Sequence, residues 1–122
     1  IIDKNRGFTP DIVRRWLSTC SAMTILMDQH ASRGEKLTFL GRPALTFTTA
    51  ARLAIRYGVP VVVGSFVRTG PYSYRLVGGA PIVFGKTADR AAATQLLNDR
   101  LGDAVRRYPE QYLWAHRRWR MD

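Results

Sequence analysis

The amino-acid sequence predicts a mixed α/β domain in which a βαβ crossover and an antiparallel hairpin share one sheet flanked by helices. Short runs rich in β-branched residues, stretches of helical apolar spacing between them, and Gly-Pro turns at their boundaries indicate this class. The 122 residues are enough for one core and too few for two ordinary domains. We treat residues 1–122 as one partial domain, the carboxy-terminal portion of a larger one, because the chain begins in mid-pattern without a turn, a cap or an initiator methionine.

Three segments have the features of helices. Residues 9–19 begin with Thr-Pro-Asp, which combines an N-cap residue, a proline at the first helical position and an acid near the positive end of the dipole. Residues 44–57 have helical apolar spacing and are followed by Gly58, a residue typical just beyond a helix end. Residues 88–107 place apolar side chains on one face and charges on the other, which predicts an amphipathic helix covering a sheet.

The strands are predicted from apolar runs. Residues 23–27 read as a buried strand followed by polar residues, at the sheet end where open α/β folds bind ligands. A loop is expected over 31–43. Residues 61–67 and 72–77, joined by the turn at Gly70-Pro71, predict the hairpin. The first strand, the helix over 44–57 and the strand over 61–67 would form a right-handed crossover.

The charge of the chain indicates an anionic partner. Nineteen Lys and Arg residues against nine Asp and Glu residues give a net charge of +10, which suits nucleic acid, a phosphorylated small molecule or an anionic membrane. Cys20 is the only cysteine, so an intramolecular disulfide and a four-cysteine metal site are excluded and a reducing compartment is favoured. No run reaches the roughly 18 apolar residues that span a bilayer, so any membrane contact of this segment is expected to be peripheral.

Four blocks of sequence carry a resemblance to a known family. They are Ile-Leu-Met-Asp-Gln-His at 25–30, Phe-Leu-Gly-Arg-Pro-Ala at 39–44, Gly-Val-Pro-Val-Val at 58–62 with Phe66 and Arg68, and Tyr-Pro-Glu-Gln-Tyr-Leu-Trp-Ala-His-Arg-Arg-Trp-Arg at 108–120. In this order they resemble the bacterial lipid A biosynthesis lauroyl/myristoyl acyltransferases, which are lysophospholipid acyltransferase-like enzymes. The resemblance covers about residues 23–120, and its terminal block is the most specific.

The resemblance implies a lipopolysaccharide-biosynthesis enzyme that moves a fatty acyl chain onto a hydroxyl of a lipid A precursor or related glycolipid. The implied donor is an acyl carrier protein thioester or acyl-CoA, with no other cofactor and no metal. The implied partners are acyl carrier protein, the anionic glycolipid and the cytoplasmic face of the bacterial inner membrane.

In the family that the sequence resembles, a His-x4-Asp/Glu pair removes the proton of the acceptor hydroxyl. No histidine precedes Asp28, so this pair is expected upstream of residue 1, and the segment alone is expected to be inactive. His30 and Glu35 satisfy the same spacing and are secondary candidates. Without the pair, a non-catalytic remnant of the scaffold remains an alternative.

Asp28, Arg42 and Arg68 are the expected substrate-binding residues. Both implied substrates are anionic, and guanidinium groups stay charged and pair with phosphate in bidentate geometry. Arg42 lies within one matching block and Arg68 closes another, while Asp28 follows the first predicted strand and could orient an arginine or a hydroxyl.

The terminal block is expected to be helical and to contact a membrane or phosphate through Arg117, Arg118, Trp119 and Arg120. Aromatic rings suit headgroup depth and cations suit anionic lipid. The same mixture of Arg with Trp and Tyr leaves a nucleic-acid-binding module open as a rival. No helix-turn-helix, zinc-finger or RNA-recognition motif supports that rival, so nucleic acid is not an expected partner.

Overall fold

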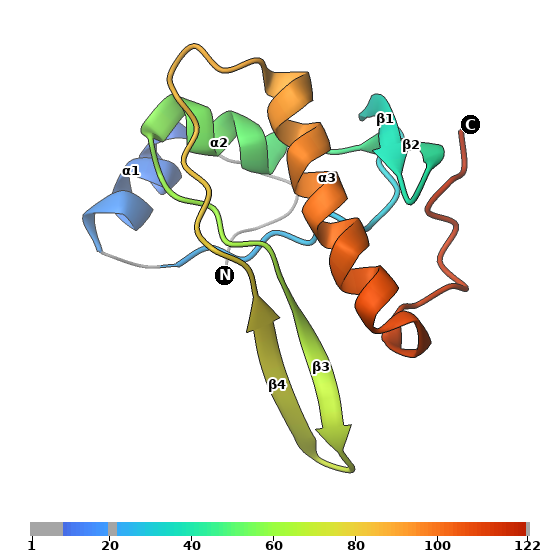
Figure 1. Ribbon diagram of the computed structural model, residues 1–122. Helices are drawn as coiled ribbons and strands as arrows, with labels where there is room; N and C mark the ends of the chain where they lie inside the picture. The colour runs from blue at the N-terminus through green and yellow to red at the C-terminus, as the bar shows by residue number, and fades with distance from the viewer. Residues whose placement is uncertain (1–8, 20–21, 122) are drawn as a thin grey trace.

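The computed structural model describes residues 9–19 and 22–121, in which three α-helices and two separate antiparallel hairpins are built around the helix α3 (Figure 1). The helices are α1 (Pro10–Ser18), α2 (Thr49–Tyr57) and α3 (Arg90–Arg107), the strands are β1 (Glu35–Phe39), β2 (Arg42–Thr46), β3 (Gly64–Gly70) and β4 (Ser73–Gly78), and η1 (Pro109–Gln111) is a 3₁₀ turn. The mixed α/β class is therefore confirmed. The expected single sheet is replaced by two two-stranded sheets.

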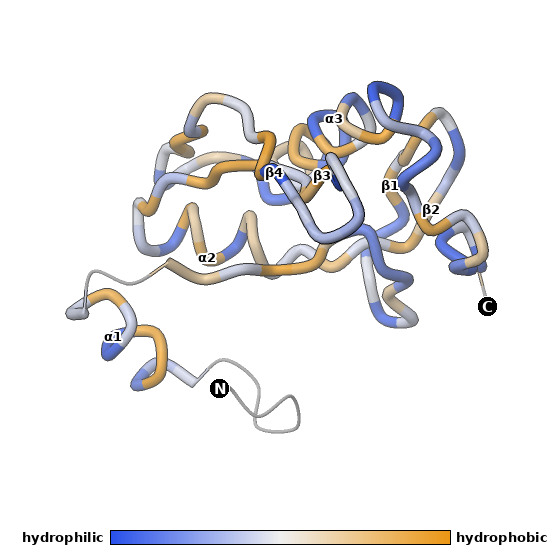
Figure 2. Tube along the Cα trace, turned by 90° about the horizontal axis from the view of Figure 1, so that it is seen from below, coloured by the Kyte–Doolittle hydropathy of each residue, from blue (hydrophilic) through white to orange (hydrophobic). Residues whose placement is uncertain are grey.

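Helices α1 and α3 confirm the predictions from their end signals. The Thr9 hydroxyl accepts a hydrogen bond from the Ile12 amide at 3.4 Å, and Pro10 opens α1. Asp89 caps α3 in the same way, accepting from the Ala92 amide at 2.7 Å. Figure 2 shows α1 set apart from the body of the described chain. Cys20 lies outside the described residues.

The loop predicted over 31–43 and the start of the helix predicted over 44–57 were wrong. These residues contain the hairpin β1–β2, whose two-residue turn has Leu40 at φ 52° and Gly41 at φ 79°. Positive φ at both central positions is what a tight hairpin turn needs, and leucine rarely adopts it, so the turn gave no ordinary signal. Because β2 extends to Thr46, α2 begins only at Thr49, and it ends at Gly58 with φ 64°, as predicted.

The strand predicted over 23–27 is absent, and with it the βαβ crossover. Residues 22–27 have no regular structure, and Ile25 and Met27 pack against the core. A strand needs a neighbour to pair with, and within the described chain no segment pairs with this run. The hairpin predicted over 61–67 and 72–77 is confirmed as β3–β4, with the boundaries shifted and Val61 paired only in an isolated bridge with Ile82.

Helix α3 joins two small core clusters. One is formed by small side chains of α2 and α3, together with Leu97, and is covered by residues of the loops. The other is formed by Phe39, Ala44 and Val105, with Trp119 packed against it. The second cluster ties the β1–β2 hairpin to the carboxy-terminal segment, which brings together two of the blocks identified in the sequence.

Candidate functional site

The terminal segment turns inward rather than continuing as a helix. After η1, residues 112–121 form irregular turns, so the helical expectation was wrong. Trp114, which a helix packed on its own domain would bury, is 53% exposed, whereas Arg118 has no exposed surface. The buried position removes Arg118 from the residues that could contact a membrane, while Arg117 and Arg120 remain exposed.

Arg118 is held by the β1–β2 hairpin. Its Nη1 donates to the Leu45 carbonyl at 2.6 Å and its Nη2 donates to the Thr46 hydroxyl at 2.7 Å. The guanidinium carbon lies 5.1 Å from the centre of the Phe39 ring. A cation–π contact and charge-assisted hydrogen bonds together explain why an arginine can occupy this interior position.

The segment after residue 27 meets the terminal segment at the two histidines of the chain. The His30 amide donates a hydrogen bond to His116 Nε2 at 3.0 Å, across 86 residues of sequence. The His116 side chain thus accepts through Nε2 in this contact. The structure therefore joins the Asp-Gln-His block to the terminal block. The sequence of either block alone does not predict this contact.

Asp28, Tyr112 and Arg118 interact electrostatically. Burial raises the pKa of Tyr112, the negative charge of Asp28 raises it further, and the positive charge of Arg118 opposes both. Burial lowers the pKa of Arg118, while Tyr112 and Asp28 oppose that shift. The Tyr112 phenol is thus kept neutral and able to donate a hydrogen bond well into the alkaline range.

We call Asp28, His30, Thr46, Tyr112, His116 and Arg118 the Arg118 cluster. Three of its polar atoms, His30 Nε2, the Tyr112 hydroxyl and Arg118 Nε, are buried and have no hydrogen-bond partner within the described chain. Buried polar groups in folded proteins almost always have partners. All three can donate to oxygen, and all three are closed off from solvent in the described structure.

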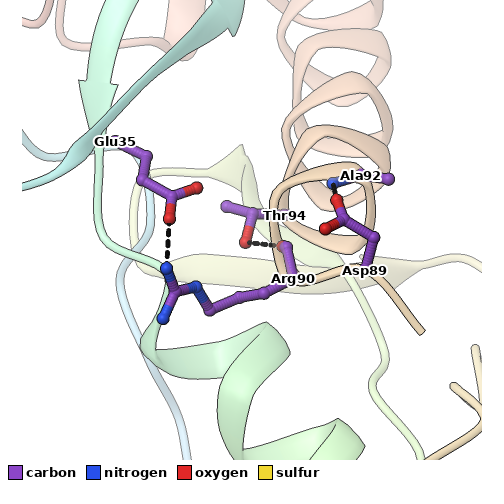
Figure 3. Close-up of polar contacts among 5 residues, drawn as sticks. All are labelled: Glu35, Asp89, Arg90, Ala92 and Thr94. Carbon is purple, nitrogen blue, oxygen red and sulfur yellow. Dashed lines mark hydrogen bonds and ion pairs between the residues drawn. The ribbon is translucent and has the colours of Figure 1, made fainter. Parts of the chain in front are cut away.

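Glu35 serves a different contact from the one its spacing suggested. Its Oε1 pairs with Arg90 Nη2 at 2.5 Å, next to the start of α3 (Figure 3). In the described part of the chain, no hydrogen bond or ion pair joins Glu35 to His30. The structure thus separates these two secondary candidates.

The other expected substrate-binding residues lie on different hairpins. Arg42 is exposed at the start of β2, with its guanidinium carbon 5.5 Å from the centre of the Trp119 ring. Arg68 folds over the turn of β3–β4, where its Nε donates to the Gly70 carbonyl at 3.0 Å and its Nη2 donates to the Pro71 carbonyl at 2.7 Å. Asp28 joins Arg118, while Arg42 and Arg68 are not brought together.

Sequence reasoning assigned no role to His116 or Thr46, and it grouped Tyr112 only with the aromatic residues suited to a membrane interface. Tyr112 and His116 belong to the terminal block, so their presence in that block was the available signal. Thr46 was hidden by the wrong helix boundary. Asn98 supports it by donating to the Thr46 hydroxyl at 3.2 Å, and this amide interrupting the apolar face of α3 was a usable hint of a buried polar partner.

Among residues 9–19 and 22–121, no three His, Cys, Asp or Glu side chains gather in a way that could hold a metal ion. Across the same residues, no helix combines the length and apolar character needed to cross a bilayer.

Comparison with known protein families gives a match. The family described as bacterial lipid A biosynthesis acyltransferase matches residues 2–121. No curated protein and no solved structure matches the chain. Because the family match spans almost every residue, the chain belongs to the bacterial lipid A biosynthesis acyltransferases.

Proposed function

We propose that the protein transfers a fatty acyl chain from an acyl carrier protein thioester, or from acyl-CoA, to a hydroxyl of a lipid A precursor or related glycolipid. The observation that carries the proposal is the family match over residues 2–121. The net charge of +10 supports it, because the acidic carrier protein, the phosphorylated acceptor and the membrane are all anionic. We place the reaction at the cytoplasmic face of the bacterial inner membrane.

In the proposed reaction a histidine paired with a carboxylate removes the proton of the acceptor hydroxyl. The oxygen then attacks the thioester carbonyl, an ester bond forms, the carbon–sulfur bond breaks, and the thiol leaves with a proton. His30 and Glu35 lack mutual contact in the structure, so they do not supply this pair in the conformation described. The chain's proposed share of the reaction is substrate binding.

We propose that the Arg118 cluster positions the substrate-binding residues, because it ties the segment at 28–30 and the β1–β2 hairpin to the terminal segment. Arg42 is proposed to pair with phosphate, because it is exposed and its stacking on Trp119 leaves its nitrogens available. Arg68 is proposed to do so from the second hairpin.

Steady-state kinetics of the protein encoded by the complete gene test this assignment. Arg42→Ala and Arg68→Ala are each expected to raise KM for the phosphorylated acceptor about tenfold, which corresponds to the loss of one charge-assisted contact. Arg100→Ala, at an exposed position of α3, is the matched control and should leave the kinetics unchanged. Unchanged kinetics in both test variants would remove Arg42 and Arg68 from the substrate site.

A further inference from the structure

The β3–β4 hairpin projects from the body of the molecule (Figure 1), and several of its large apolar side chains are exposed. Phe66 pairs with Leu76 and Arg68 pairs with Tyr74 across the two strands, and directly paired residues share one face of a sheet. Phe66 is 70% exposed, and Leu76 and Tyr74 are each 64% exposed. We call these three side chains, with Tyr72 at the turn, the hairpin face. Tyr72 is 97% exposed.

The hairpin lies within a long stretch of chain that has no acidic residue. All nine Asp and Glu residues of the sequence fall in 1–35 or 89–122, so every charged residue in 36–88 is a Lys or an Arg. These cations are Lys36, Arg42, Arg52, Arg56, Arg68, Arg75 and Lys86. In space, Glu110 is the acid that lines the hollow beside Phe66 and Tyr74, and the hairpin itself carries the cations Arg68 and Arg75. The hairpin thus combines a net positive charge with an exposed apolar face, which is complementary to a surface that is both apolar and anionic.

Part of the backbone around the hairpin face is already satisfied, which lowers the cost of placing this part of the hairpin against lipid. On the outer edge of β3, Gln111 Oε1 accepts from the Arg68 amide at 2.6 Å and Gln111 Nε2 donates to the Arg68 carbonyl at 3.3 Å. The Arg68 side chain caps the two turn carbonyls of Gly70 and Pro71. The Nη1 of Arg68 takes no part in these bonds and is available to a lipid phosphate.

The terminal aromatic residues are less suited to this role, because the fold uses their polar ends. Trp119 Nε1 donates to the Phe39 carbonyl at 3.0 Å, and Trp114 Nε1 donates to the Pro109 carbonyl at 2.7 Å. The two indoles also stack on each other with ring centres 6.3 Å apart. By contrast, the large side chains of the hairpin face point into solvent.

We propose that the hairpin face is a membrane-docking element that inserts into the headgroup region of an anionic bilayer. Aromatic and aliphatic side chains enter the apolar boundary while Arg68, which shares their face of the hairpin, contacts lipid phosphates. A nucleic acid fits less well, because its phosphates offer no apolar surface to Phe66 and Leu76, and leucine cannot stack on a base. This inference goes beyond the proposed acyl transfer and holds whether or not the chain takes part in it.

Co-sedimentation of the purified chain with vesicles tests the proposal. Binding is compared between phosphatidylcholine vesicles and the same vesicles with about one third phosphatidylglycerol, and the anionic vesicles should bind more tightly. The double variant Phe66→Ser with Leu76→Ser is expected to lower the partition coefficient at least about thirtyfold, since each apolar side chain withdrawn from lipid is worth about tenfold. The matched control is Leu26→Ser with Leu113→Ser, at sites that are 64% and 68% exposed, and should bind like the parent.

A second measurement keeps the native hairpin and does not depend on the serine variants folding. In a Cys20→Ser background, a polarity-sensitive fluorophore is attached at Tyr72→Cys or, as control, at Leu113→Cys. On anionic vesicles the probe at position 72 should shift to the blue and be quenched by lipid-bound nitroxide, while the control should not. Equal responses at both positions would overturn the proposal.

Two further outcomes would also overturn it. One is a loss of vesicle binding in the control pair as large as in the hairpin pair. The other is tighter binding to DNA than to anionic vesicles in a salt titration, abolished by the hairpin variant, which would make nucleic acid the occupant. Acyl transfer measured in detergent micelles distinguishes a failure of membrane docking from a failure of the proposed acyl transfer. A hairpin variant that has lost only membrane docking should retain the turnover of the parent in micelles.

Discussion

Replacing Arg118 by alanine tests whether the buried guanidinium holds the terminal segment in place. The change removes the hydrogen bonds to the Leu45 carbonyl at 2.6 Å and to the Thr46 hydroxyl at 2.7 Å. Each bond to a charged group contributes about 1.5–3 kcal/mol, and the emptied volume beside Phe39 adds to the loss. Removing a buried charge offsets part of this, so we expect a net loss of about 3–4 kcal/mol in the free energy of unfolding.

Arg118→Met separates hydrogen bonding and charge from packing. Methionine fills most of the volume and carries no charge, so the expected loss is below about 2 kcal/mol. Urea unfolding followed by tryptophan fluorescence measures both variants, with Arg117→Ala at the neighbouring exposed position as the control, expected within about 0.5 kcal/mol of the parent. An alanine loss below about 1 kcal/mol, or a methionine loss equal to it, would refute this reasoning.

Three further perturbations test the surroundings of the Arg118 cluster. A Cβ at Gly34 would lie 2.5 Å from the Thr46 carbonyl oxygen, so Gly34→Ala should lower the free energy of unfolding by about 2–3 kcal/mol. Gly85→Ala, where a Cβ would meet open space, is the control and should leave the free energy of unfolding within about 0.5 kcal/mol of the parent. Equal effects of the two substitutions would contradict the close approach at Gly34. Asn98→Ala removes a donor to the Thr46 hydroxyl and should cost about 1–2 kcal/mol in denaturant unfolding, and no loss would mean that water replaces it. Because the neutral Tyr112 phenol is favoured in the folded state, folding stability should fall as pH rises from 10.0 through the raised pKa, and Tyr112→Phe should lessen this fall. The titration of Tyr112 is measured as the absorbance difference between the two folded proteins. A midpoint at or below 10.0 would contradict the cause assigned to the pKa shift.

The elements that the sequence predicts correctly have local signals. Helix α1 follows from the Thr-Pro-Asp start, and α3 follows from eighteen residues of amphipathic spacing. The β3–β4 hairpin follows from β-branched residues on either side of Gly70-Pro71. In each case the residues that determine the element lie within it or directly beside it, so no distant contact was needed to identify it.

The elements that the sequence misses depend on distant contacts. Leu40 adopts positive φ while packing beside the Phe39 and Val105 cluster, and that tertiary contact overrides the low preference of leucine for the turn. Residues 22–27 have the composition of a strand, yet pairing decides whether a strand forms. Composition therefore identified an apolar segment without identifying its structure.

The candidate site shows the same division. Asp28 and Arg118 could both be singled out from motifs, but their proximity depends on the terminal segment folding back over β1–β2. Burial of Arg118 was not predictable, because arginine at the end of a basic stretch normally remains in water. The joining of His30 to His116 also arises only in the folded chain.

Direct detection of the acylated product tests the central claim most sharply. The protein encoded by the complete gene is incubated with acyl carrier protein thioester and a lipid A precursor, and the glycolipid is analysed by mass spectrometry. The account predicts that the glycolipid gains the mass of one fatty acyl group as the thioester is consumed. A folded, vesicle-bound protein that leaves the mass of the precursor unchanged with both carrier-protein and coenzyme A thioesters would contradict it.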